Sequence, residues 1–189
     1  MNRILQGKVG MTKRTAESKE LSLLESVYQY VKFAGRLQED CIFQGGNNSA
    51  HLPKKHNNFA VINLINLRKI GTNEQVYTDN SVIVTSTMQA GVQVDMYGNS
   101  LELARQNIEP VHNLFHDVIA CDFFAPHGFT PLYADDLQVM LISDESKQYV
   151  PRILTTLYFN YKNTVELPYQ TFSAVTPNIM NVDVKFPPK

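Results

Sequence analysis

Residues 82–96 alternate between two kinds of side chain without a break. The even positions are apolar or small, namely Val82, Val84, Ser86, Met88, Ala90, Val92, Val94 and Met96, and the odd positions are mainly polar. Because successive side chains of a strand point to opposite faces, this pattern predicts one half-buried β-strand. At roughly 3.3 Å per residue it would be about 50 Å long, whereas most strands have about five or six residues. We therefore expect it to outrun the domain core as a β-ribbon that reaches toward a neighbouring subunit.

The composition limits the kinds of protein that this chain can be. Its 189 residues, 43% of them hydrophobic, suffice for one well-filled core with arms and are few for two full domains. The 17 basic and 18 acidic side chains give a formal net charge of -1, which favours a protein partner over free DNA. No apolar run reaches the roughly 18 residues of a membrane span, and no secretory signal is recognisable, so we expect a soluble protein without membrane contact.

The segment before the long strand predicts a helix and a second strand. From Ser18 onward, apolar residues recur at helical spacing and predict an amphipathic helix that ends near Gly45-Gly46. Residues 59–67 are rich in branched apolar side chains and predict a strand, which ends in the sequence up to Thr72. A polar loop through Asp79-Asn80 leads into the long strand, so that the two strands form a ribbon.

The segment after the long strand predicts a second helix and two more strands. Asn99, with Glu102 following in the sequence, predicts a capping box at the start of this helix. Pro110 lies within the apolar stripe of the helix, where it should either kink the helix or open a second short one. Strands are expected over residues 137–142 and 149–162.

The resulting order of elements is α-β-β-α-β-β. It predicts an α+β two-layer sandwich, in which about four strands form a mostly antiparallel sheet with both helices on one face. We expect a flexible N-terminal arm over residues 1–18, the core over residues 19–163 and an extended C-terminal tail over residues 164–189. This tail is too apolar for a solvated linker and too rich in proline for a central strand, so it should dock on another surface.

Signatures of catalysis are absent from the sequence. It has no G-x-x-x-x-G-K-[ST] loop, no G-x-S-x-G elbow and no H-E-x-x-H helix. His112 and His116, followed by Asp117, have a spacing that can bring two imidazoles to one metal. No third ligand stands at a recognised offset, and ordinary helix-surface or half-buried histidines are the favoured interpretation. We expect no catalytic residue, metal or cofactor.

Two segments resemble the neck and tail-terminator proteins of tailed bacteriophages: VINLINLRKIGT at residues 61–72, and VQVDMYGNS at residues 92–100. In that family a strand that ends in an arginine and an IGT-like turn precedes a long strand, a YG turn and a helix. The resemblance covers roughly residues 59–162 and agrees with the element order above. It implies a ring, usually of six copies, that lies at the head-proximal end of the tail, stops tube growth there and presents a surface to the neck.

The leading hypothesis is a structural virion protein of a tailed phage, not an enzyme, at the head-tail junction. It would assemble in the host cytoplasm with itself and with other phage neck and tail proteins. DNA would pass through the ring lumen without sequence-specific binding. The expected subunit contacts on the ribbon are Thr85, Thr87, Gln89 and Gln93. Those on the tail are Phe172, Ile179, Met180 and Phe186. The residues expected to face the lumen and its DNA are Lys54, Lys55, Arg68 and Lys69.

Two rival hypotheses come from other classes of protein. A small metal-dependent hydrolase would use His112, His116 and Asp117. A monomeric adaptor with a peptide-binding groove would show no self-association. Within the phage hypothesis, a tail terminator, a neck stopper and another collar component remain alternatives, and the subunit number remains open.

Overall fold

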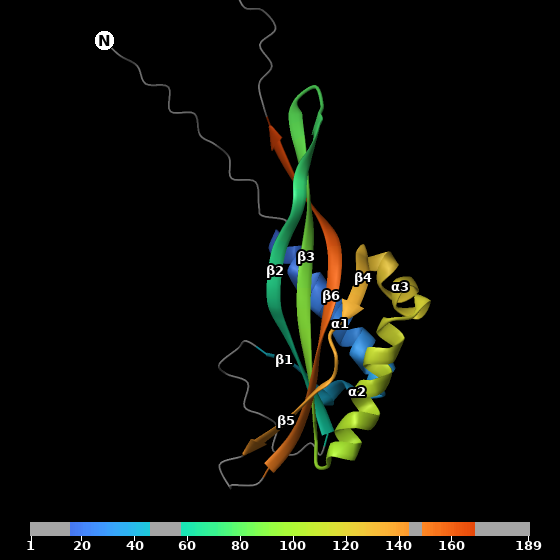
Figure 1. Cartoon of the computed structure of the whole chain (residues 1–189). Helices are drawn as coiled ribbons and strands as arrows, with labels where there is room; N and C mark the ends of the chain where they lie inside the picture. Colours follow the sequence, from blue (N-terminus) through green and yellow to red (C-terminus); the bar gives the residue numbers. More distant parts are fainter. Residues whose placement is uncertain (1–15, 46–57, 144–148, 169–189) are drawn as a thin grey trace, which may run out of the picture.

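The computed structural model describes residues 16–45, 58–143 and 149–168. The elements follow in this order: α1 Ala16–Gly35, η1 Glu39–Cys41, β1 Ile42–Gln44, β2 Asn58–Tyr77, β3 Ser81–Gly98, α2 Leu101–Phe115, α3 Val118–Phe124, η2 Ala125–His127, β4 Phe129–Ala134, β5 Gln138–Ser143 and β6 Tyr149–Pro168. The α+β class predicted from the sequence is confirmed. The long strand is also confirmed, since β3 covers the whole alternating segment (Figure 1).

The described strands form one mixed, open sheet of six strands, not of about four. Its order is β1-β2-β3-β6-β4, and β5 pairs with β6 beside β4. Strand β1 runs parallel to β2, while the other pairs are antiparallel. The sequence did not predict β1 or β4 for physical reasons: β1 has only three residues, too few for a periodic pattern, and β4 contains Pro131.

Helix α1 ends at Gly35, earlier than the predicted end near Gly45-Gly46. The next residue, Arg36, has a φ of 53°, and this left-handed conformation ends the helix. Leu37 lies beyond the helix but is buried, so it continues the apolar pattern without continuing the helix. The residues up to Gln44 form η1 and β1 instead.

The second helical region also differs from its prediction in two details. Ser100, not Asn99, caps α2, because its side chain accepts a hydrogen bond from the Leu103 amide at 3.2 Å. Pro110 lies inside α2, and the second short helix begins only at Val118. The capping box predicted from Glu102 is therefore wrong, and a separate helix exists but does not start at Pro110.

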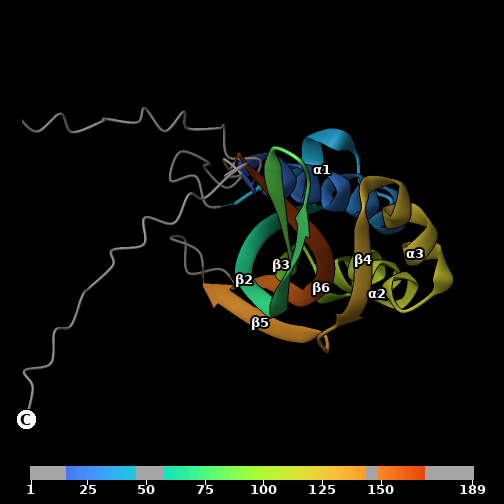
Figure 2. The same cartoon turned by 90° about the horizontal axis from the view of Figure 1, so that it is seen from above.

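The hydrophobic core lies between the helices and the lower half of the sheet. The even residues of β3 from Ala90 to Met96 and the odd residues of β6 from Ile153 to Phe159 face the helices, and nearly all of them are fully buried. An aromatic cluster closes this core, with the Phe159 ring centroid 5.1 Å from Phe115 and 4.8 Å from Phe124. Viewed from above, the three helices group together beside the curved strands (Figure 2).

The upper half of the sheet continues beyond the helices as a ribbon (Figure 1). Its register joins Ser81 to Pro168 and Val82 to both Tyr77 and Leu167, so the ribbon contains β2, β3 and β6. The sequence predicts only a two-stranded ribbon. Since β6 runs on to Pro168, residues 164–168 continue the sheet, and the free edges of the ribbon belong to β2 and β6.

Candidate assembly surface

The histidine pair at the C-terminal end of α2 does not gather a metal-ligand cluster in the described ranges. The ring centroids of His112 and His116 are 4.9 Å apart. Asp117 caps α3, where its carboxylate accepts the Ile119 amide at 3.1 Å. No group of three or more His, Cys, Asp and Glu side chains that could hold a metal occurs among the described residues.

No helix in the described part of the chain is long and apolar enough to cross a membrane.

The ribbon residues expected from the sequence to contact a partner lie on the central strand. Thr85, Thr87, Gln89 and Gln93 share the face of β3 that points away from the helices, and β3 is paired on both sides. Gln89 is buried and accepts a 2.6 Å hydrogen bond from Arg68 Nε. These four residues can therefore meet a partner only through the face of the sheet, and Gln89 is already engaged within the subunit.

The expected lumen residues are placed only in part. Arg68 lies opposite Gln89 and Lys69 lies opposite Met88, so the two basic side chains point to opposite faces of β2. Only one of them can face a lumen lined by a given face of the sheet. Lys54 and Lys55 lie outside the described residues, as do the four tail residues Phe172, Ile179, Met180 and Phe186.

A buried polar network, not predicted from the sequence, fixes the lower end of the face opposite the helices. Asp95 is only 2% exposed; its carboxylate accepts hydrogen bonds from Arg152 at 2.9 Å and from Gln93 at 2.8 Å. The Arg152 guanidinium also lies over the Tyr97 ring, which stacks on Phe59 with centroids 4.6 Å apart. Burial raises the pKa of Tyr97, although Arg152 opposes this shift. The network therefore joins β2, β3 and β6 in one register.

Both outer edges of the ribbon run beyond the strands that cover them in the described part of the chain. Strand β1 covers β2 only at residues 60–62, and β4 covers β6 only at residues 157–161. Among the described residues, the outer edge of β6 over residues 162–168 has no neighbouring strand. Open strand edges are templates for pairing with another chain.

The direction of the backbone groups along this edge follows from the alternation of a strand. The Thr156 carbonyl accepts the Asp135 amide on the outer side, and Pro131, which has no N–H, lies opposite Phe159. Even residues of β6 therefore point their N–H and C=O groups outward, and odd residues point theirs toward β3. The uninterrupted pairing with β3 carries this alternation upward, so Lys162, Thr164 and Glu166 present outward amides.

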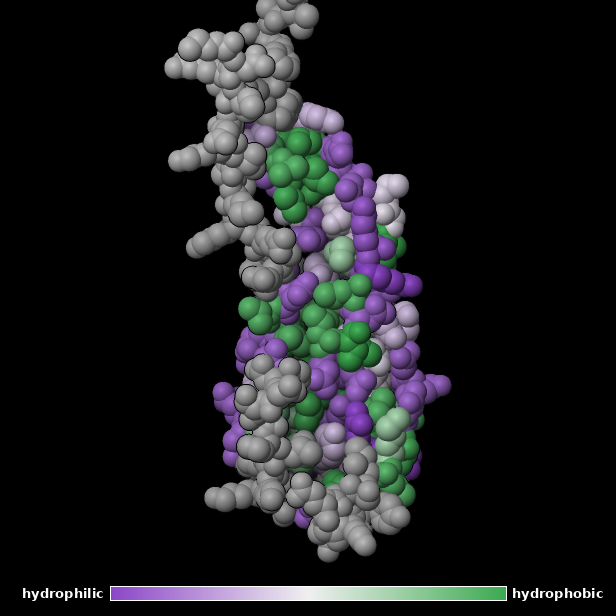
Figure 3. Space-filling view, turned by 90° about the vertical axis from the view of Figure 1, so that its left-hand side faces the viewer, coloured by the Kyte–Doolittle hydropathy of each residue, from purple (hydrophilic) through white to green (hydrophobic). Residues whose placement is uncertain are grey.

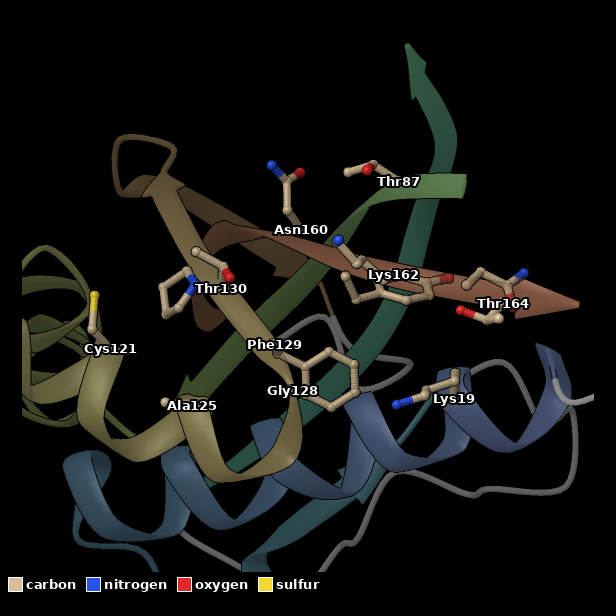
Figure 4. A pocket seen from close by; sticks show the side chains of 13 residues that line it. Lys19, Thr87, Cys121, Ala125, Gly128, Phe129, Thr130, Asn160, Lys162 and Thr164 are labelled. Carbon is tan, nitrogen blue, oxygen red and sulfur yellow. The ribbon is translucent and has the colours of Figure 1, made fainter. Parts of the chain in front are cut away.

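A hollow opens beside Phe129, where β4 begins and where the free edge of β6 starts. It has a volume of about 790 Å³. Figure 4 shows it between Lys19 of α1 and Phe129 of β4 on one side and Lys162 and Thr164 of β6 on the other. Since the hollow continues the line of β4 beside β6, an added strand would find open space there rather than a wall.

The ribbon also exposes apolar side chains, which a neighbouring copy could cover. Val165 and Leu167 are 47% and 48% exposed, and they lie opposite Val84 and Val82 on the face that continues the core. On the β2 side, Val76 is 50% exposed. Figure 3 shows apolar patches on this side of the molecule, one of them near the top, separated by polar side chains.

Two comparisons with known proteins bear on the family of this chain. The family model described as phage neck terminator protein matches residues 22–188, which include the core and the ribbon. A comparison with curated proteins found no match. The resemblance inferred from the two sequence segments is confirmed, and the chain belongs to the phage neck terminator proteins, a family of structural proteins of the phage neck.

Proposed function

We propose that this chain assembles into a closed ring of about six copies at the head-tail junction, where it ends the tail tube and joins it to the neck. Phage neck terminator proteins are structural, and their place in the virion implies contact with other neck and tail proteins. The observation that carries the proposal is the three-stranded ribbon, whose open edges extend past the helices. An open strand edge exposes a monomer to unwanted pairing, whereas in a ring it can pair with a segment of the neighbouring copy.

We further propose that DNA passes through the ring lumen without sequence readout. The formal net charge of the chain is -1, so the subunit as a whole does not hold DNA tightly. Arg68, on the face opposite the helices, is oriented by Gln89 and is the described basic residue that we assign to the lumen. A single oriented guanidinium per subunit meets phosphates at a spacing set by the ring and carries no base specificity.

The solution mass of the purified chain tests the ring. We expect light scattering to give one species several times the 21.5 kDa of the chain, and electron microscopy to show ring-shaped particles. Arg68→Gln should leave the mass unchanged, because its buried partner Gln89 remains in place. The same variant should weaken retention of nonspecific DNA at low salt, because it removes the guanidinium that would contact phosphates. A strict monomer at high concentration would contradict the ring, and unchanged DNA retention would contradict the lumen assignment.

A further inference from the structure

The C-terminal sequence contains a second alternating segment that resembles a donor strand. Residues 180–186 read MNVDVKF, with Met180, Val182, Val184 and Phe186 on the even positions and Asn181, Asp183 and Lys185 between them. Such a segment would bury one face and solvate the other if it formed a strand. Pro187 and Pro188 follow, and proline ends ladder pairing because it has no N–H.

The free edge of β6 carries the matching pattern. Tyr161, Asn163, Val165 and Leu167 lie on the face that continues the core, and Lys162, Thr164 and Glu166 lie on the other. A strand laid beside this edge would set its apolar residues against Val165 and Leu167, which are about half exposed. Its polar residues would then lie beside the charged side chains of Lys162 and Glu166. The edge ends at Pro168, which offers no outward amide.

The length of the intervening chain favours a second copy over the same subunit as the acceptor. Residues 169–179 separate the end of β6 from the alternating segment and can span about 36 Å when extended. A return beside the same strand needs to cover only about 4.8 Å, and hairpin loops commonly have about two to five residues. A connection this long suits a crossing between subunits.

We propose that residues 180–186 of one copy add as a strand to residues 162–167 of the next copy, in line with β4. The hollow beside Phe129, Lys162 and Thr164 is where the added strand would begin or end. Each chain then has one donor and one acceptor, so the contact is head-to-tail, the type that forms a ring when the rotation between copies closes. This inference rests on the proposed function, because it names the contact that holds the ring together.

Two single-purpose variants of the full chain test the contact. Thr164→Pro removes an outward amide of the acceptor edge without removing a bond to β3, and Thr164→Val keeps that amide as its control. Val182→Asp with Val184→Asp charges the apolar face of the donor. Its control, Asn181→Asp with Lys185→Asn, changes the net charge equally but only on the polar face.

We call Thr164→Pro the acceptor-blocked variant and Val182→Asp with Val184→Asp the donor-blocked variant. Each blocked variant should remain folded, as judged by circular dichroism, and should be monomeric in light scattering. The two controls should assemble as the wild type does. A mixture of the two blocked variants should give one-to-one pairs and no rings, since one intact donor meets one intact acceptor. A pair in place of a ring is an outcome that aggregation or misfolding would not produce.

The results separate this contact from the ring itself. If the wild type forms rings and both blocked variants also form them, the ring stands and the proposed contact is wrong. If both blocked variants are monomers but their mixture gives no pairs, the tail pairs within its own subunit and the crossing is wrong. If the wild type is itself a monomer, the proposed function fails first.

Discussion

Strand β3 passes through two environments, and the difference between them separates folding from assembly. In its lower half, Ala90, Val92, Val94 and Met96 are fully buried beneath the helices, and Asp95 is buried on the opposite face. In its upper half, residues 82–88 are only partly covered, although the alternating pattern is the same. A binary pattern therefore says which face of a strand is apolar. It does not say whether the subunit itself covers that face.

The largest predicted effect on unfolding free energy comes from shortening an apolar side chain of β6 to alanine. The cost should depend on whether the residue lies in the lower half of the sheet or in the ribbon. Phe159→Ala should cost about 3–5 kcal/mol of unfolding free energy, because Phe159 is fully buried among Phe115 and Phe124. Val165→Ala, on the same face but 47% exposed, should cost well under about 1 kcal/mol. Urea denaturation of a monomeric background, such as the donor-blocked variant, measures both values. Similar losses of unfolding free energy at the two positions would refute the division of the sheet into a folding half and an assembly half.

The buried ion pair should give the next largest effect. Arg152→Met leaves the Asp95 carboxylate buried without its cation, which should cost about 3 kcal/mol. The exposed pair between Arg105 and Glu109 provides the control, and Arg105→Met should leave the melting temperature nearly unchanged. Thermal unfolding compares the two variants. If Arg152→Met left the melting temperature unchanged, the network would not hold the lower end of the sheet together.

A smaller effect is expected from the hydroxyl of Tyr30. It lies in the core and donates a 2.9 Å hydrogen bond to the Val111 carbonyl, so Tyr30→Phe should cost about 1 kcal/mol. Burial raises the pKa of Tyr30, which means that its stabilisation is complete below the unfolded pKa of about 10 and declines at higher pH. The wild type should therefore lose stability more steeply than Tyr30→Phe above about pH 10. Parallel pH slopes would contradict this assignment.

The smallest effect on folding should come from the ribbon itself. Gly71 has a φ of 72° near the irregularity between Ile70 and Glu74, and nothing lies within 4 Å of a Cβ added there. Gly71→Ala should cost about 1 kcal/mol or less through backbone strain, while Gly71→Asn should be nearly neutral because asparagine tolerates this conformation. Denaturation titrations of both variants check the difference. Equal costs would point to a packing effect rather than to backbone strain.

Much of the fold could be predicted from the sequence, because long elements repeat their pattern. Strand β3 and helix α2 show enough periods to identify their type, and the α+β class follows from their order. Strand β1, with three residues, and β4, with Pro131, show no such repeat. Helix α1 ends because Arg36 adopts a left-handed conformation. The sequence does not show this end, because the buried Leu37 continues the apolar spacing of the helix.

The candidate site was harder to predict, because it depends on which strands are neighbours. The sequence indicates exposed ribbon edges, but it does not show that β6 pairs with the full length of β3 and takes one edge of the ribbon. The Asp95–Arg152 contact likewise joins residues far apart in the chain. An acidic residue on the polar side of a long strand gives no sign of its partner until the register is known.

Residue-resolved hydrogen exchange on the ring and on the donor-blocked monomer tests the central claim most directly. If open ribbon edges build the ring, the outward amides of Lys162, Thr164 and Glu166 should exchange much more slowly in the ring than in the monomer. The amides of Asn163, Val165 and Leu167, which point toward β3, should be protected in both. Equal, fast exchange of the three outward amides in both samples would contradict assembly through this edge.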